Sequence, residues 1–102
     1  MPLLVKAINQ AGMLISSPDS RQFHSGLVLL EEGNEVGEHE TGSGEEMIIF
    51  MEGTAEVSCD GESKTVKAPA VAVIPPHTPH SIRNRSRALL RYVYVYNTAA
   101  KG

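Results

Sequence analysis

Residues 33–53 read GNEVGEHETGSGEEMIIFMEG and carry the pattern that decides the fold. Two short strands are predicted here, Val36–Glu40 and Glu46–Met51, because each run is brief and ends at turn-forming residues. Between them lies Thr41-Gly42-Ser43-Gly44, a composition that favours a flexible loop. The apolar spacing of an amphipathic helix is absent. The stretch therefore predicts a hairpin-like pair of strands.

The same pattern continues outward in both directions. Short apolar or alternating runs recur, bounded by Gly, Pro, Asn or Asp, and Asp60-Gly61 is a strong signal for a two-residue hairpin turn. Strands this short and this regularly spaced predict an all-β fold, either a closed barrel or a two-sheet jelly roll. At 102 residues, one domain over residues 1–102 is expected. The remaining predicted strands are Leu3–Lys6, Met13–Ser16, Gln22–Leu30, Thr54–Cys59, Lys64–Ala68, Val71–Ile74, His80–Asn84 and Leu89–Tyr96.

The charges of the chain are unevenly distributed. The formal net charge is −3, which argues against nucleic acid as the main partner. Eleven of the twelve acidic residues lie within residues 31–62, where there is no Lys or Arg, and four Arg lie within residues 83–91, where there is no acid. This split makes one region cation-attracting and another anion-attracting, or it reflects two solvated surfaces.

The sequence carries no signal for oxidation, secretion or membrane insertion. Cys59 is the only cysteine, so the fold does not depend on an internal disulfide. Residues 1–12 lack a charged segment followed by a sustained apolar run, and no stretch approaches the ~20 apolar residues of a membrane helix. We therefore expect a cytoplasmic protein with no membrane partner.

The last predicted strand includes the run RYVYVY at residues 91–96. Tyrosine and valine alternate, so both faces of this strand are apolar. One face would meet the core and the other a partner subunit, which predicts a homodimer.

Two histidines and a glutamate are candidate metal ligands. His39 ends one predicted strand, Glu46 begins the next, and His80 opens a later one. Strand ends beside loops are where sites are usually built. Two imidazoles and one carboxylate suit Zn, Fe, Mn, Ni or Co. A strand-end histidine is also commonly a hydrogen-bonded structural residue, so residue type alone leaves both interpretations open.

The spacing of these residues resembles the two conserved motifs of the cupin superfamily. The first motif is Gly, five residues, His, one residue, His, three or four residues, Glu, six residues, Gly. In register with it are Gly33, His39, Glu46 and Gly53. The second is Gly, five residues, Pro, one residue, Gly, two residues, His, three residues, Asn. In register with it are Pro75, His80 and Asn84. Together the motifs span half of the chain, and the likeness is to the small single-domain cupins.

The resemblance implies a double-stranded β-helix, the jelly-roll cupin barrel, which is often dimeric. It also implies a divalent metal held inside the barrel near one mouth by His39, Glu46 and His80, with Asn84 and the motif glycines structural. A metal-free cupin would instead keep Glu46 as a buried carboxylate paired with Arg or His.

Three positions depart from the motifs. Thr41 replaces the second histidine, and as a neutral hydroxyl it is a poor ligand, so a coordination position is left open. His77 stands where the second motif has Gly; it could swing in as the replacement ligand, or it lines the mouth or hydrogen-bonds the adjoining loop. Pro69 stands at the opening Gly of the second motif, which predicts a differently built turn.

Other residues receive simpler interpretations. Glu45 is predicted to face outward, because adjacent residues of a strand point to opposite sides. His24 has no motif support and is predicted to be structural or on the surface. Three methionines are predicted to fill the core: Met13, Met47 and Met51.

Two functions from different classes are open. The first is a metal-dependent enzyme acting on a small polar metabolite such as a sugar, keto acid or hydroxy acid. Isomerisation, dioxygenation and decarboxylation are all consistent with the resemblance, and His77 is the only general acid–base candidate. The second is a non-catalytic small-molecule sensor or storage module with a degenerate or empty metal site, which the missing fourth ligand favours.

Overall fold

A computed structural model describes residues 3–98 of the chain. Within this range the chain forms nine β-strands. Their bounds are β1 Gly12–Ile15, β2 Phe23–Leu30, β3 Glu35–Glu40, β4 Glu45–Glu52, β5 Thr54–Cys59, β6 Glu62–Lys67, β7 Ala70–Ile74, β8 Pro79–Arg83 and β9 Leu90–Asn97. Nine of the ten predicted strands are confirmed. No helix in residues 3–98 is long and apolar enough to cross a membrane.

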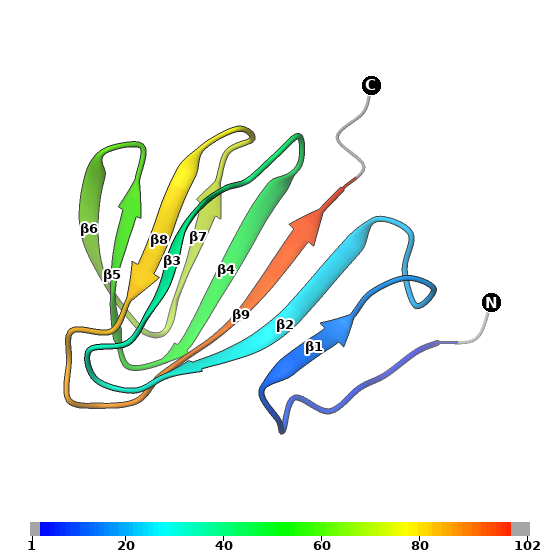
Figure 1. Ribbon diagram of the computed structural model, residues 1–102. Helices are drawn as coiled ribbons and strands as arrows, with labels where there is room; N and C mark the ends of the chain where they lie inside the picture. The colour runs from blue at the N-terminus through cyan, green and yellow to red at the C-terminus, as the bar shows by residue number, and fades with distance from the viewer. Residues whose placement is uncertain (1–2, 99–102) are drawn as a thin grey trace.

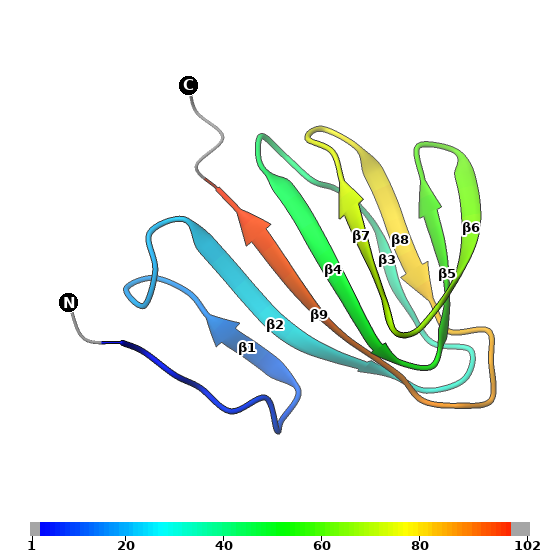
Figure 2. The ribbon, with the colours of Figure 1, turned by 180° about the vertical axis from the view of Figure 1, so that it is seen from behind.

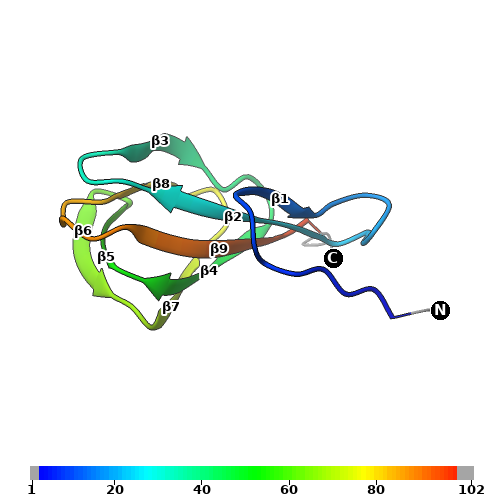
Figure 3. The same cartoon turned by 90° about the horizontal axis from the view of Figure 1, so that it is seen from below.

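The strands form two antiparallel sheets that face each other (Figures 1 and 3). One has five strands in the order β1-β2-β9-β4-β7, and the other has four in the order β3-β8-β5-β6. Neighbours in a sheet are therefore often distant in sequence, as with β2 and β9. This arrangement confirms the predicted jelly-roll, double-stranded β-helix architecture.

The core lies between the sheets and follows from the two-residue alternation of each strand. Ile48 and Phe50 of β4 point inward with 0% and 1% exposure, and their neighbours along the strand do not. Fully burying a side chain of this size contributes about 1.5–3 kcal/mol. The remaining buried members of the cluster are Leu30, Ala55, Val57, Ile74, Ile82, Leu90 and Tyr92.

The outer side of the five-stranded sheet is also apolar, and Figure 2 shows the strands that form it. In the pairing of β4 with β7, Met47 lies opposite Val73 and Ile49 lies opposite Val71. The prediction that Met47 fills the core is wrong, because alternation with Ile48 turns it outward, where it is 44% exposed. Met13, at 72%, is likewise not a core residue. We call Phe23, Leu29, Met47, Ile49, Val71 and Val73 the outer apolar face.

The predicted strand Leu3–Lys6 does not form. Residues 3–9 run beyond β1 without entering either sheet (Figure 1). Two polar contacts hold this segment: Lys6 Nζ donates to Asp19 Oδ2 at 2.7 Å, and Arg91 Nη2 donates to Ile8 O at 3.1 Å. An apolar run is a strand only where a neighbouring strand accepts and donates its backbone hydrogen bonds. Leu3, Leu4, Val5 and Ile8 are left exposed.

Asn84 joins the loop between β8 and β9 to the end of β2. It is 0% exposed, and its Nδ2 donates to Leu30 O and to Ala88 O, both at 2.8 Å. Its Oδ1 accepts from the backbone N and from Oγ of Ser86, both at 2.9 Å. The side chain thereby satisfies both ends of its amide and fixes the loop between β8 and β9 against the end of β2. This agrees with the structural role that the resemblance implies.

The turn after β4 requires glycine. Gly53 has φ +89°, and a Cβ there would collide with the carbonyl oxygen of Leu89. The motif glycine is therefore explained by both the backbone conformation and the close approach of a second strand.

Candidate metal centre

His39 and His80 lie opposite each other in the four-stranded sheet. They are Cα partners in the antiparallel pairing of β3 with β8, so their side chains leave the same face. Their ring centroids are 4.2 Å apart, with 60° between the planes. His80 is 2% exposed and His39 is at the surface. The centre is therefore open on the His39 side.

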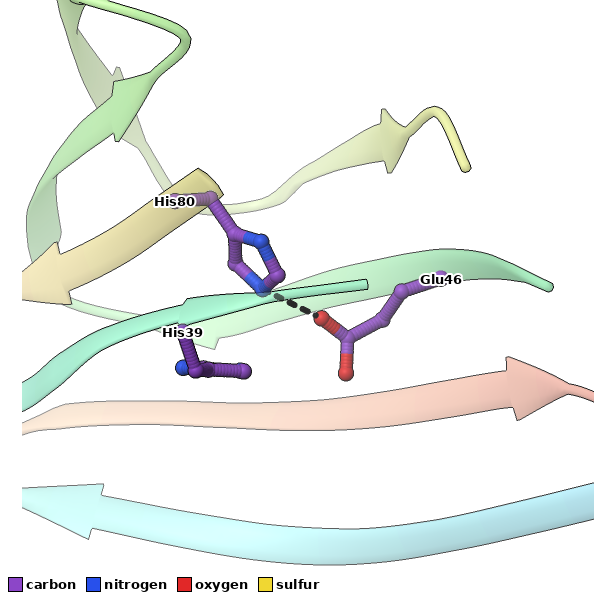
Figure 4. Close-up of side chains that lie close together, drawn as sticks. All are labelled: His39, Glu46 and His80. Atoms are coloured by element: carbon purple, nitrogen blue, oxygen red, sulfur yellow. Dashed lines mark hydrogen bonds and ion pairs between the residues drawn. The ribbon is translucent and has the colours of Figure 1, made fainter. Parts of the chain in front are cut away.

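Glu46 approaches these histidines from β4 of the facing sheet (Figure 4). Its Oε1 lies 3.0 Å from Nε2 of His80. One ligand atom from each of the three residues lies within 4.8 Å of the others. Within residues 3–98 this is the only such group of three or more His, Cys, Asp or Glu. The three sequence-predicted ligands thus come together, one from each of three strands.

Backbone carbonyls fix both imidazole rings. His39 Nδ1 donates to Gly37 O and His80 Nδ1 donates to Thr78 O, each at 2.9 Å. Because a carbonyl can only accept, each Nδ1 carries a proton and each Nε2 is the nitrogen left for a metal. One proton then lies between His80 Nε2 and Glu46 Oε1, and a cation bound by both atoms would replace it. The donor set fits a divalent metal.

Thr41 is 7% exposed, and its hydroxyl is directed to the backbone. Oγ1 donates to Thr78 O at 3.1 Å, the carbonyl that also accepts from His80 Nδ1. Thr41 therefore supports the carbonyl that orients His80. Its role as an additional ligand stays a prediction.

His77 lies outside the three-residue group. Its Nδ1 is 3.6 Å from Glu40 Oε1, and both side chains are mostly exposed. Its φ of 54° explains why the family motif has glycine here, since this conformation is strained for other residues. Its backbone N donates to Gly42 O at 2.7 Å, which agrees with the interpretation that His77 hydrogen-bonds the adjoining loop. Its place at the mouth and its ligand role stay predictions.

The loop between β3 and β4 is held close to β9, which positions the start of β4. The backbone N of Gly44 donates to the hydroxyl of Tyr96 at 3.0 Å. A Cβ at Gly44 would collide with Asn97 O. Two residues later Glu46 points inward, while Glu45 is exposed, as the alternation of a strand predicts.

Sequence reasoning missed His24 and the inward tyrosines as lining residues. Register places His24, Tyr96, Glu46 and Ile74 in one row across the five-stranded sheet. The next row contains Tyr94, whose hydroxyl lies where Gly26 leaves room for it. The alternation of residues 91–96 showed that one face holds the tyrosines, but only the pairing of β2 with β9 shows that this face meets the site.

Two hollows adjoin the three candidate ligands, and both are also lined by Tyr94. The aliphatic hollow has a volume of about 330 Å³, and its further lining residues are Val28, Val36, Ile48, Ile82 and Tyr92. The polar hollow has a volume of about 260 Å³, and its further lining residues are His24, Glu40, Thr41 and Tyr96. The site therefore has chemically different surroundings on its two sides.

Tyr92 is buried beside the acidic group of the centre. Burial is the main cause that raises the pKa of the Tyr92 phenol far above its ordinary value, with the charges of Glu46 and Tyr94 adding to it. The phenol therefore stays protonated at physiological pH. It can donate a hydrogen bond inside the barrel and cannot act as a phenolate base.

The family comparison agrees with this fold and site. The model of the Cupin 2 family, a cupin domain, matches residues 26–96. The chain belongs to the cupin family. None of the curated proteins compared with it matches.

Several solved structures are similar over most of the chain. The Cnp3 cupin domain of Schizosaccharomyces pombe has a TM-score of 0.79 at 20% identity, over 86% of this chain and 63% of that one. A predicted oxalate decarboxylase from Thermotoga maritima has a TM-score of 0.67 at 24% identity, over 74% and 64%. The chain thus spans slightly less than two thirds of either. A Cupin 2 conserved barrel domain protein from Salinispora arenicola has a TM-score of 0.77 at 27% identity, over 89% and 76%.

Proposed function

We propose that this cupin binds one divalent transition metal through His39, Glu46 and His80 and uses it to hold a small polar metabolite. The observation that carries the proposal is the convergence of three ligand atoms within 4.8 Å, with both imidazoles oriented by backbone carbonyls. Two nitrogens and one oxygen suit Zn, Fe, Mn, Ni or Co. When bound, such a metal supplies Lewis-acid polarisation of a ligand oxygen.

The protein's own residues would then orient and shield the metabolite. Thr78 O and Gly37 O hold the imidazoles, the rim residues around His77 border the mouth, and the Tyr92 hydroxyl offers a neutral donor. An isomerase, a dioxygenase or a decarboxylase would each be compatible with this arrangement. The similar Thermotoga maritima structure is that of a predicted oxalate decarboxylase, which makes decarboxylation one reaction to assay.

The alternative is a non-catalytic sensor or storage cupin. It is favoured by Thr41, which occupies the position of a fourth ligand but donates its hydroxyl hydrogen to Thr78 O. Turnover of a bound metabolite by the metal-loaded protein would support the enzyme; binding without turnover would support the sensor.

Metal content tests the proposal directly. Protein purified without chelator is expected to contain close to one transition-metal ion per chain by elemental mass spectrometry. Chelation should remove the ion while the far-ultraviolet circular dichroism stays unchanged, because the core between the sheets is built without it. Protein that contains no transition metal and takes up none when Zn(II), Mn(II), Fe(II), Co(II) or Ni(II) is added would refute the metal site.

We also propose that the chain forms a homodimer through the outer apolar face. The described part of the chain has twelve exposed large apolar side chains, of which six belong to this face and four to residues 3–8. A standard interface buries about 800 Å² per partner, and the six side chains of the outer apolar face would form the apolar centre of such an interface. A second copy fits this surface because it brings an equal apolar area and no charge to its centre.

The substitution Val73→Asp tests the dimer. Two-fold symmetry places the new charge in both partners, so the dimer dissociation constant should rise at least about 100-fold. Sedimentation equilibrium should show a dimer for the parent and a monomer for the variant. Leu89→Asp is the matched control, because Leu89 is 39% exposed and lies in the loop before β9, off this face. A parent that is already monomeric would refute the proposal.

A further inference from the structure

The aliphatic hollow has the composition of a pocket for a hydrocarbon group. Apart from the candidate ligands and two tyrosines, it is lined by Val28, Val36, Ile48 and Ile82. A hydroxyl-rich body such as a sugar would lose its water there and find no side-chain partner beyond the candidate ligands and the two tyrosines. Each buried polar group left without a partner costs about 1–3 kcal/mol. At about 330 Å³ the hollow is at the small end of ligand pockets. It therefore favours a short aliphatic chain.

The charges around the site limit the ligand to a single negative charge. Among residues 3–98, no Lys or Arg lines either hollow. A bound divalent cation carries two positive charges, and the Glu46 carboxylate would neutralise one of them. The remaining positive charge would be balanced by one carboxylate of the ligand. A phosphate or a dicarboxylate would bring a second negative charge close to Glu46 and, in the polar hollow, Glu40. The arrangement thus selects against doubly charged ligands.

Tyr92 supplies a polar contact inside the aliphatic hollow. It is 3% exposed, and its ring is held against Phe50 at a centroid distance of 5.6 Å. Its hydroxyl has no hydrogen-bond partner within the part of the chain that the structure describes. Because every fully buried side-chain N or O atom in this part of the chain has a partner, the unpaired Tyr92 hydroxyl is open to the hollow, where it can donate to a ligand. A ligand oxygen beside the metal would satisfy it.

We propose that the metabolite is a small 2-hydroxy or 2-oxo monocarboxylic acid with an aliphatic side chain. Its two adjacent oxygen groups would bind the metal, its side chain would enter the aliphatic hollow, and the Tyr92 hydroxyl would donate to it. This inference rests on the metal site proposed above. It selects the acids over the sugars and places the specificity in Val28, Val36 and Tyr92.

Calorimetry on the Zn(II)-loaded protein tests the inference without requiring turnover. The probes are lactate, 2-hydroxybutanoate, 2-hydroxypentanoate and 2-hydroxyhexanoate. Affinity should rise about fourfold with each added methylene until the hollow is filled. Gluconate is the comparator, because it has the same six carbons and the same 2-hydroxy acid group but a hydroxylated body. It should bind at least tenfold more weakly than 2-hydroxyhexanoate.

Four substitutions separate the contribution of the aliphatic hollow from that of Tyr92. Val36→Phe fills the hollow and should abolish the rise in affinity with chain length, while lactate still binds. If this variant does not fold, Val28→Phe fills the hollow from the opposite sheet. Val71→Phe adds the same ring on the outer apolar face and should leave the series unchanged. Tyr92→Phe should weaken every acid about two- to tenfold without changing the dependence on chain length.

The outcomes distinguish the two proposals. Failure to bind Zn(II), measured first by competition with a fluorescent chelator, would overturn the metal site and this inference with it. Normal Zn(II) binding with a flat affinity series, or with gluconate bound as tightly as 2-hydroxyhexanoate, would overturn the inference alone. A rising series that Val36→Phe or Val28→Phe flattens and Val71→Phe does not would support it.

Discussion

Replacing His80 with alanine is expected to lower the affinity for Zn(II) by more than about 100-fold, since even residues that only support metal ligands cost 10- to 100-fold when changed. His80 is the most buried of the three candidate ligands and contacts Glu46 Oε1 directly. Its loss leaves one imidazole and one carboxylate, too few to bind a tetrahedral metal tightly. Competition with a fluorescent chelator would measure the change, and circular dichroism would verify the fold.

His77→Ala is the control for this measurement. His77 is mostly exposed, so its removal should change Zn(II) affinity by less than about threefold, in line with a side chain outside the ligand group. A tenfold loss would instead assign His77 as the replacement ligand. An unchanged affinity in His80→Ala, with the fold intact, would show that the three residues are not the metal site.

Replacing Asn84 with alanine is expected to lower the free energy of unfolding by about 3 kcal/mol, because several buried hydrogen-bonding groups lose their partner together. For a domain of this size that corresponds to a fall in melting temperature of roughly 10–20 °C. The effect should be independent of metal, since the Asn84 side chain bonds to Leu30, Ser86 and Ala88 and to none of the candidate ligands. Thermal melting of the metal-free protein followed by circular dichroism would measure it.

Two further substitutions test which contacts of Asn84 matter. Ser86→Ala removes the hydroxyl bonds to Asn84 Oδ1 and Ala88 O but keeps the backbone contact, so it should cost only about 1 kcal/mol. Asn84→Asp keeps the shape but cannot donate to Leu30 O, and it should be at least as harmful as alanine. A melting temperature for Asn84→Ala within a few degrees of the parent would show that the loop does not depend on this side chain.

Most strands could be predicted because their signal is local. Alternation and turn residues such as Asp60-Gly61 define a strand without knowledge of its partner. The same locality explains the wrong prediction of Leu3–Lys6, where an apolar run has no neighbouring strand in the described part of the chain. It also explains Met47, because the sequence shows that it faces away from Ile48 but not which side is the core.

The sequence by itself determined the class of fold and the three candidate ligands, since both are encoded in short spacings of residue types. Only the tertiary structure decided what surrounds those ligands. His24, Tyr92 and Val28 come from strands far along the chain from Glu46, and they meet it through the pairing of β2 with β9 and of β9 with β4. The register of strands distant in sequence depends on the packing of the whole barrel, which no local pattern specifies.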